Sequence, residues 1–189
     1  PKFDYYKSVA VVHNGIIENY LEIKTQLQSK GYKFVTDTDT ECIANLISSY
    51  IKDGYSIDKS IDLTIERITG HAAVLILSED HPSSIYGFKK GFAGSLLIGK
   101  SDEQIAIASD FQTLISNSKE YMVLEDGERV VARTDGILIS NGKSNVKKKW
   151  LPINEDEEIV SKNNYQFFME KEIHEQSDVF LKNFQGRVD

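Results

Sequence analysis

The spacing of apolar residues changes at Gly70, and this change constrains the fold more than any other feature of the 189-residue chain. Before Gly70, apolar residues recur at intervals of three and four, which is the spacing of helices with one buried face. After Gly70 they occur in short continuous runs, which are typical of buried strands. Helices followed by antiparallel strands predict an α+β layered fold instead of a doubly wound one.

Before Gly70, a short strand and three helices are predicted. Residues 9–13 form a β-branched apolar run that stops at Asn14-Gly15, which predicts a buried strand ending in a sharp turn. Thr38 and Glu41 have the spacing of a capping box, so a helix should begin there. The apolar stripes of the three helices are Ile16, Tyr20, Ile23 and Leu27; Ile43, Leu46, Ile47, Tyr50 and Ile51; and Ile57, Ile61, Ile65 and Ile68.

After Gly70, the pattern predicts an antiparallel meander. Asp126-Gly127, Asp135-Gly136 and Asn141-Gly142 can supply the positive φ angles that tight hairpins need. A polar linker over residues 154–164 should precede a last amphipathic helix. The predicted strands are residues 72–77, 96–98, 105–108, 121–124, 130–132 and 137–139, and the last helix carries Met169, Ile173, Phe180 and Phe184.

The composition excludes several classes of protein. The net charge is −7 and the only basic run, residues 147–149, is followed by an acidic stretch, so we expect no nucleic-acid partner. No apolar segment approaches the roughly 20 residues that span a bilayer, and no signal-peptide pattern opens the chain, so we expect no membrane partner and a cytoplasmic location. The single cysteine, Cys42, excludes an internal disulfide and a cysteine-rich metal site.

The tripeptide His13-Asn14-Gly15 is the first candidate for chemistry. A side-chain amide and a neighbouring glycine N–H at a strand end can direct two donors at one point, which is what an oxyanion requires during acyl transfer. The alternative is an ordinary turn between a strand and a helix, because Asn-Gly is a common turn dipeptide.

Thr38-Asp39-Thr40-Glu41 is the second candidate. Asp39 falls in the first turn of the predicted helix, where the helix dipole and free N–H groups keep a carboxylate ionised and able to hold a ligand's ammonium group. In the alternative interpretation, Asp39 and Glu41 only cap the helix.

The remaining reactive side chains indicate no further site. The four histidines share no spacing typical of metal ligands, so we expect no bound metal, and no motif predicts a cofactor. Cys42 lies within the second predicted helix without a basic neighbour to lower its pKa, which favours a buried structural thiol.

Taken in order, several segments resemble the class II glutamine amidotransferase domain, a family of N-terminal-nucleophile hydrolases, and within it the glucosamine-6-phosphate synthase type. Residues 11–20 read Val-Val-His-Asn-Gly-Ile-Ile-Glu-Asn-Tyr, and residues 168–176 read Phe-Met-Glu-Lys-Glu-Ile-His-Glu-Gln. The other matching segments are residues 31–34, 38–41, 107–110 and 124–128. Some of these elements also occur in the purine-pathway amidotransferase.

The resemblance implies a four-layer αββα sandwich, here incomplete at its N-terminus. It implies that glutamine is cleaved through a thioester on an N-terminal cysteine, with Asn14 and the Gly15 N–H as the oxyanion hole and Asp39 holding the α-amino group of glutamine. It further implies ammonia transfer to a sugar-isomerase domain that converts fructose 6-phosphate to glucosamine 6-phosphate, and a homo-oligomer.

This sequence departs from the family pattern in two places. The catalytic cysteine and two segments near it have no counterpart in the chain, so we expect a fragment that is inactive alone and complemented by an N-terminal segment. Gly94-Ser95-Leu96-Leu97 replaces a Ser-Pro-Leu motif at one edge of the family's pocket. We assign residues 1–164 to the amidotransferase domain and residues 165–189 to a C-terminal helix that starts the connection to a sugar-isomerase domain.

Two other functions remain open at the level of sequence. The chain could be a non-catalytic module that binds glutamine or docks onto a partner. It could also be the amidotransferase domain of a purine-pathway enzyme.

Overall fold

The computed structural model describes residues 2–4, 6, 8–115, 117–142, 144–153 and 165–184. The chain divides into two compact units, Pro1–Ile153 and Asn154–Asp189. The helices are α1 (Tyr20–Ser29), α2 (Asp39–Lys52), α3 (Ile57–Arg67), α4 (Phe111–Ile115) and α5 (Phe168–Phe184). The strands are β1 (Lys2–Phe3), β2 (Val9–Ile17), β3 (Gly70–Ser78), β4 (Ser84–Lys90), β5 (Leu97–Lys100), β6 (Ile105–Ala108), β7 (Glu120–Val123), β8 (Arg129–Arg133), β9 (Gly136–Ser140) and β10 (Leu151–Pro152).

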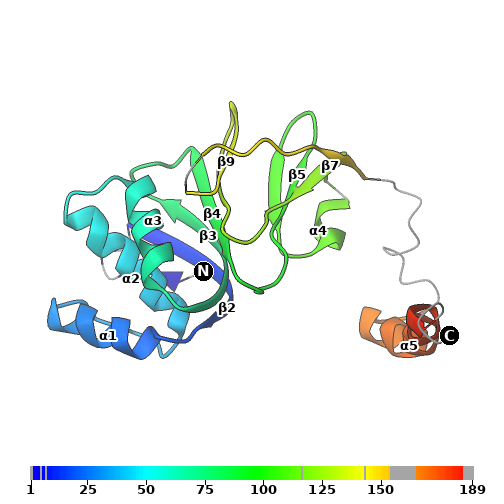
Figure 1. Cartoon of the computed structure of the whole chain (residues 1–189), viewed down its shortest axis with the longest axis horizontal. Coiled ribbons are helices and arrows are strands. Elements are labelled where there is room, and N and C mark those ends of the chain that lie inside the picture. The colour runs from blue at the N-terminus through cyan, green and yellow to red at the C-terminus, as the bar shows by residue number, and fades with distance from the viewer. Residues whose placement is uncertain are drawn as a thin grey trace. The chain divides into compact units, whose positions relative to one another are not determined.

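Two antiparallel sheets form the first unit. The first has the strand order β1-β2-β3-β4-β8-β9, and the second has the order β10-β7-β5-β6. After β4 the chain leaves the first sheet, builds β5, β6 and β7 in the second, and returns at β8, as the ribbon in Figure 1 shows. The prediction of antiparallel strands is confirmed, but the prediction of one meander is wrong because β4 pairs with β8 and not with β5.

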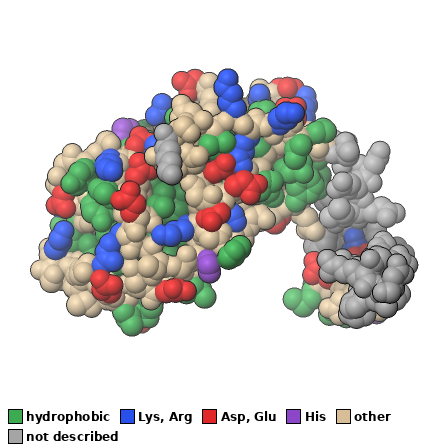
Figure 2. Space-filling model, viewed as in Figure 1, with side chains coloured by type: hydrophobic (Ala, Val, Ile, Leu, Met, Phe, Trp, Pro, Cys, Tyr) green, Lys and Arg blue, Asp and Glu red, His purple; other side chains and the backbone are tan. Residues whose placement is uncertain are grey.

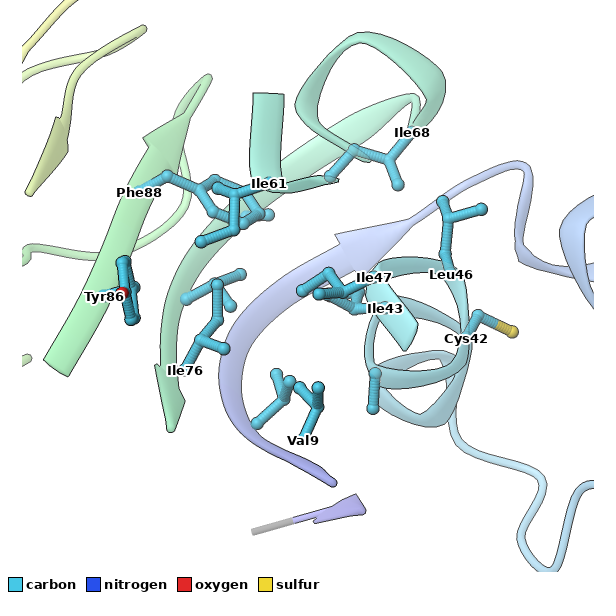
Figure 3. Close-up of a cluster of buried hydrophobic side chains, with 14 of the residues drawn as sticks. Val9, Cys42, Ile43, Leu46, Ile47, Ile61, Ile68, Ile76, Tyr86 and Phe88 are labelled. Atoms are coloured by element: carbon cyan, nitrogen blue, oxygen red, sulfur yellow. The ribbon is translucent and has the colours of Figure 1, made fainter. Parts of the chain in front are cut away.

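Helices α1, α2 and α3 cover one face of the first sheet (Figure 1). The odd-numbered residues Val9, Val11 and Ile17 of β2 are almost fully buried, as the alternation of side chains along a strand requires. They belong to a core that includes Ile43 and Ile47 of α2 (Figure 3). This core fixes the start of α2 relative to the end of β2, where the site lies.

The start of the molecule differs from the prediction in two details. The strand β2 does not end at Asn14-Gly15 but pairs with β3 as far as Ile17. The residues Thr38 and Glu41 do bracket the start of α2, yet Thr38 is the N-cap without a side-chain hydrogen bond to the helix. The capping box is therefore wrong, and Glu41 has a different role, described below.

The sequence pattern missed β4. Gly87 separates its apolar residues and two lysines end it, so residues 84–90 lack both the continuous run and the alternation that predict a strand. The predicted hairpin at Asp135-Gly136 does join β8 to β9. By contrast, Asp126-Gly127 lies in the connection from the second sheet back to the first.

The second unit contains the predicted last helix, α5. Three apolar side chains at its start are exposed: Phe167, Met169 and Ile173. The predicted linker over residues 154–164 lies outside the described residues, as do the side chains of Phe180 and Phe184. No helix among the described residues combines the length and the apolar composition that crossing a membrane requires.

Candidate active site

The backbone at the end of β2 has an open edge. The ladder to β3 continues just past the strand, where Glu18 N–H donates to the Thr69 carbonyl at 3.0 Å, so the even-numbered residues of β2 bond to β3. The odd-numbered residues therefore direct their N–H and C=O groups to the opposite edge. There β1 pairs with β2 only at Ala10 and Val11. Within the described part of the chain, the Gly15 N–H and carbonyl consequently face an edge that no strand covers.

Gly15 has a conformation that only glycine adopts readily. Its φ is +132°, and a Cβ atom at this position would lie 2.0 Å from the backbone oxygen of His71 in β3. Any side chain would thus displace one strand from the other. The sequence indicated glycine for a turn, whereas the structure requires it for the close approach of two paired strands.

The side chain of Asn14 faces a cleft between the two sheets. Asn14 is paired with Ala73 and Val12 with Leu75, so these side chains share the face of the first sheet that looks onto the second. The cleft has a volume of about 350 Å³. Its other lining residues are His13, Leu96, Ile107, Ala108, Ser109, Asp110 and Thr113.

Asp39 lies along the same open edge as Gly15. It is the first residue of α2, and its Oδ2 atom accepts a hydrogen bond of 2.8 Å from the N–H of Ile17, two residues beyond Gly15 on that edge. The N-terminal end of the helix dipole favours a negative charge here. Asp39 does not line the cleft that holds Asn14. The Asn14 amide therefore faces the cleft between the sheets, whereas the Asp39 carboxylate lies at the outer edge of β2, to which the Gly15 N–H also points.

Glu41 organises the loop that leads into α2. The carboxylate is buried and accepts hydrogen bonds from Val35 N–H at 2.8 Å, Thr36 N–H at 2.8 Å and the Thr36 hydroxyl at 2.6 Å. These bonds satisfy the buried charge, as such a charge requires. They also hold the segment before Asp39 in one conformation, so Glu41 positions the start of α2 without touching the open edge.

The side chain of His13 contacts Asp39 from the interior of the protein. Its side chain is only 1% exposed, and its Nδ1 atom is 3.8 Å from Asp39 Oδ1 and 3.3 Å from the hydroxyl of Thr40. Burial lowers the pKa of His13, against the opposing effects of the Asp39 charge and of a backbone hydrogen bond at His71. This contact was missed at the level of sequence because His13 and Asp39 lie 26 positions apart and no local motif links them.

Cys42 is a structural thiol. It is buried within α2, and its Sγ lies 3.5 Å from the carbonyl oxygen of Tyr20, to which the thiol donates. Burial raises its pKa to about 12, so the thiolate that would act as a nucleophile is scarce at neutral pH. Figure 3 shows its sulfur on the side of α2 turned away from Ile43 and Ile47. The expectation of a buried structural cysteine agrees with this geometry.

The segment that departs from the family motif borders the cleft. Leu96 lines it together with Asn14, and the ammonium group of Lys89 donates to the carbonyls of Ala93 at 2.9 Å and Gly94 at 3.3 Å. These bonds fix the turn before Leu96. Through Leu96, the segment Gly94-Ser95-Leu96-Leu97 therefore forms part of the wall of the cleft that also includes Asn14.

Charged side chains among the described residues outside this edge do not gather into a second candidate site. Figure 2 shows acidic and basic side chains interspersed over the visible face of the first unit. Among the described residues, no three His, Cys, Asp or Glu side chains gather as a metal site would require.

The fold and this site define the class of the protein. A family model for the glutamine amidotransferase domain matches residues 1–116, which is more than half of the chain. The chain belongs to this family, the class II glutamine amidotransferase domains. Its two antiparallel sheets with flanking helices confirm the predicted α+β sandwich.

Relatives with similar sequences indicate which type of class II amidotransferase the chain resembles. The chain is 36% identical over 184 residues to the glutamine–fructose-6-phosphate aminotransferase (isomerizing) of Buchnera aphidicola, covering 96% of this chain and 30% of the relative. It is 34% identical over 189 residues to the enzyme of the same name from Clostridium perfringens, covering 100% of this chain and 30% of the relative. The chain thus spans about 30% of the length of these relatives.

Solved structures share the fold. The glutamine phosphoribosylpyrophosphate amidotransferase of B. subtilis, in complex with ADP and GMP, superposes with a TM-score of 0.61 and 24% identity over 73% of this chain and 30% of that one. A class-II glutamine aminotransferase domain protein from Silicibacter pomeroyi superposes with a TM-score of 0.50 and 14% identity, over 73% of this chain and 68% of that one.

Proposed function

We propose that this chain is the glutamine-binding part of an enzyme that transfers the amide nitrogen of glutamine to fructose 6-phosphate, giving glucosamine 6-phosphate. The names of the relatives support the choice of acceptor over a purine-pathway product. The observation that carries the proposal is the placement of the Asp39 carboxylate and the Gly15 N–H on one open edge of β2.

Glutamine fits this edge by its length. A strand advances about 6.6 Å over two residues, which is the interval from Gly15 to Ile17. Extended glutamine has four bonds between its α-nitrogen and its side-chain carbonyl carbon, so it can bridge that interval. Its ammonium group binds Asp39, and its side-chain carbonyl oxygen lies at the Gly15 N–H.

The same arrangement serves amide hydrolysis. When a nucleophile attacks the side-chain carbonyl carbon, negative charge develops on its oxygen. The Gly15 N–H and the Asn14 side-chain N–H donate to that oxygen. The proton of the nucleophile passes to the amide nitrogen, the carbon–nitrogen bond breaks, and ammonia leaves while the acyl group stays on the nucleophile. Removing one such donor costs about 10² to 10³ in turnover in other enzymes.

The nucleophile is not among the residues of the chain considered alone. Cys42 is the single cysteine, and it lies buried inside a helix with a raised pKa. The 189-residue chain by itself therefore binds glutamine without hydrolysing it. A thioester mechanism requires a cysteine supplied by an N-terminal segment.

The parent protein has a larger organisation in this proposal. Residues 1–164 form the amidotransferase domain, and residues 165–189, which include α5, begin the connection to a sugar-isomerase domain. The exposed apolar residues Phe167, Met169 and Ile173 at the start of α5 are consistent with contact to a further domain. The parent acts in the cytoplasm as a homo-oligomer.

Calorimetry with glutamine tests the proposal. The unmodified chain should show saturable binding, and Asp39→Ala should weaken it at least tenfold because a charge-assisted contact is lost. Asp37→Ala is the matched control, since the Asp37 side chain is fully exposed and, among the described residues, forms an ion pair with Lys24 alone, at 3.4 Å. Equal binding by the Asp39 and Asp37 variants, or hydrolysis of glutamine by the isolated chain, would contradict the proposal.

A further inference from the structure

His13 and Asp39 form a pair that no part of the proposed reaction uses directly. The imidazole of His13 is 1% exposed and lies on the helix-covered side of β2, whereas Asp39 is 24% exposed and reaches the open edge. The buried His13 side chain is thus placed to orient the more exposed Asp39 side chain from the interior of the protein. A buried partner that fixes a ligand-binding side chain is a common means of preorganisation.

The contacts of His13 define how it is oriented. Its Nδ1 atom lies 3.3 Å from the Thr40 hydroxyl oxygen and 3.8 Å from Asp39 Oδ1. The tautomer with its proton on Nδ1 directs an N–H dipole at the Asp39 carboxylate, and it leaves the buried Nε2 atom without a hydrogen-bond partner among the described residues. In that tautomer the ring donates to the Thr40 hydroxyl and presents the positive end of its N–H dipole to the carboxylate. Burial lowers the pKa of His13, which keeps the ring neutral near neutral pH.

The contacts of Asp39 show what this orientation achieves. Its Oδ2 atom accepts the Ile17 N–H at 2.8 Å, while Oδ1 faces His13. Hydrogen-bonded through Oδ2 and 3.8 Å from the imidazole at Oδ1, the carboxylate is oriented along the edge that includes Gly15. Without the histidine, Oδ1 has no fixed neighbour on the interior side, and the carboxylate can rotate away from Ile17.

We infer that His13 is a positioning residue for Asp39: the imidazole, held by Thr40, fixes the carboxylate at the β2 edge in the orientation that receives a ligand's ammonium group. The inference rests on the proposed function for the identity of that ligand. The positioning itself is a property of the unliganded chain, and it can be measured without glutamine.

The amide proton of Ile17 reports the orientation of Asp39 directly. It lies on the open edge, and Asp39 Oδ2 is its acceptor. Amide hydrogen exchange measured by NMR on the whole chain should show Ile17 protected. His13→Gln should raise its exchange rate about tenfold, the change expected when a hydrogen bond to a charged acceptor is lost.

Two further variants separate positioning from packing. His13→Asn places an amide nitrogen near the position of Nδ1 and should restore most of the protection at Ile17, whereas His13→Gln places it near Nε2 and should not. Thr40→Val keeps the shape of the side chain but removes the hydroxyl that holds the ring, so it should raise the Ile17 rate by a few fold. The Glu18 amide, which donates to Thr69 O in the ladder to β3, is the internal control for general loosening.

The outcomes are distinguishable. Faster exchange at Ile17 with unchanged exchange at Glu18 supports the inference, even if the chain fails to bind glutamine and the proposed function falls. If His13→Gln and Thr40→Val both leave the Ile17 rate within twofold of the unmodified chain, the inference is wrong. It is equally wrong if Ile17 and Glu18 accelerate together in both variants, because His13 then acts only through packing.

Discussion

At the scale of single residues, the site depends on a glycine and a histidine whose roles are set by distant strands and helices. From the sequence, Gly15 has two interpretations, an N–H donor for an oxyanion and a residue of a tight turn, and the first strand was expected to end there because Asn-Gly is common in turns. The actual constraint is the backbone oxygen of His71, which pairing with β3 brings close. Such a constraint comes from a partner 56 residues away and leaves no local pattern.

Gly15→Ala should lower the free energy of unfolding by about 3 kcal/mol, because the added Cβ meets His71 O and the backbone has a positive φ. Gly31→Ala separates the two effects. Gly31 also has a positive φ, of +90°, but a Cβ there meets no atom within 4 Å. It should cost only about 1 kcal/mol. Urea denaturation measures both, and equal costs would show that the contact with His71 is unimportant.

His13 should make stability depend on pH in the acid range. Its pKa is lowered in the folded state, so between its ordinary value and the lowered one the unfolded chain binds more protons than the folded chain. The stabilisation is therefore complete above about pH 6.5 and is lost as pH falls through the lowered pKa. His13→Gln should lose less stability than the unmodified chain between pH 6.5 and 5, measured by urea denaturation. Parallel curves for the two proteins would refute this.

At the scale of elements, α2 and α3 were predictable, whereas α4, the start of α1 and the strand pairing were not. Ile16, expected on the first helix, lies in β2. The stripes of α2 and α3 recur at three and four residues, and burial of one face suffices to define such a helix. The antiparallel strands were found where apolar runs are continuous, and β4 was missed where Gly87 interrupts them. Which strand pairs with which depends on the two crossings between sheets, and their connections contain the same turn residues as hairpins.

The junction between α3 and β4 supplies a test at this scale. The ammonium group of Lys90 donates to the carbonyls of Ile65 and Ile68 at the end of α3, each at 2.6 Å. Lys90→Met should therefore lower the free energy of unfolding by about 1 to 2 kcal/mol, because carbonyls at a helix end lose their partner. Lys59→Met, on the exposed face of α3, should change it by less than about 0.5 kcal/mol. Equal thermal denaturation midpoints for the two variants would be inconsistent with this role.

At the scale of the whole molecule, the two edges of the first sheet differ. At one edge, the segment of β2 from His13 to Ile17 pairs with β3 on its inner side and with no described strand on its outer side, and Ile16 is 69% exposed there. At the other edge, β9 is short and its end is bridged to Asn145. Open edges with apolar side chains favour pairing with another chain.

The isolated chain should accordingly associate through β2 as its concentration rises. Ile16→Lys should shift light-scattering masses toward the monomer, because a charged residue blocks edge pairing. Leu138→Lys on β9 is the matched control and should leave the masses unchanged, since Leu138 is 47% exposed on the opposite edge. A chain that stays monomeric at every concentration, or a Leu138 variant that is equally effective, would rule out this edge as the interface.

The crossing from β4 to β8 has a consequence for how such domains diversify. The Lys89 N–H donates to the Glu128 carbonyl at 2.9 Å, and the Gly127 N–H donates back to the Lys89 carbonyl at 3.0 Å. The segment between Lys89 and Gly127, which includes β5, β6 and β7, therefore leaves the first sheet and returns to it at two adjacent, hydrogen-bonded positions. Insertions, deletions or a transplanted module in this interval need not disturb the register of β2 and β3. Evolution can therefore remodel the wall opposite Asn14 while Gly15 and Asp39 keep their places.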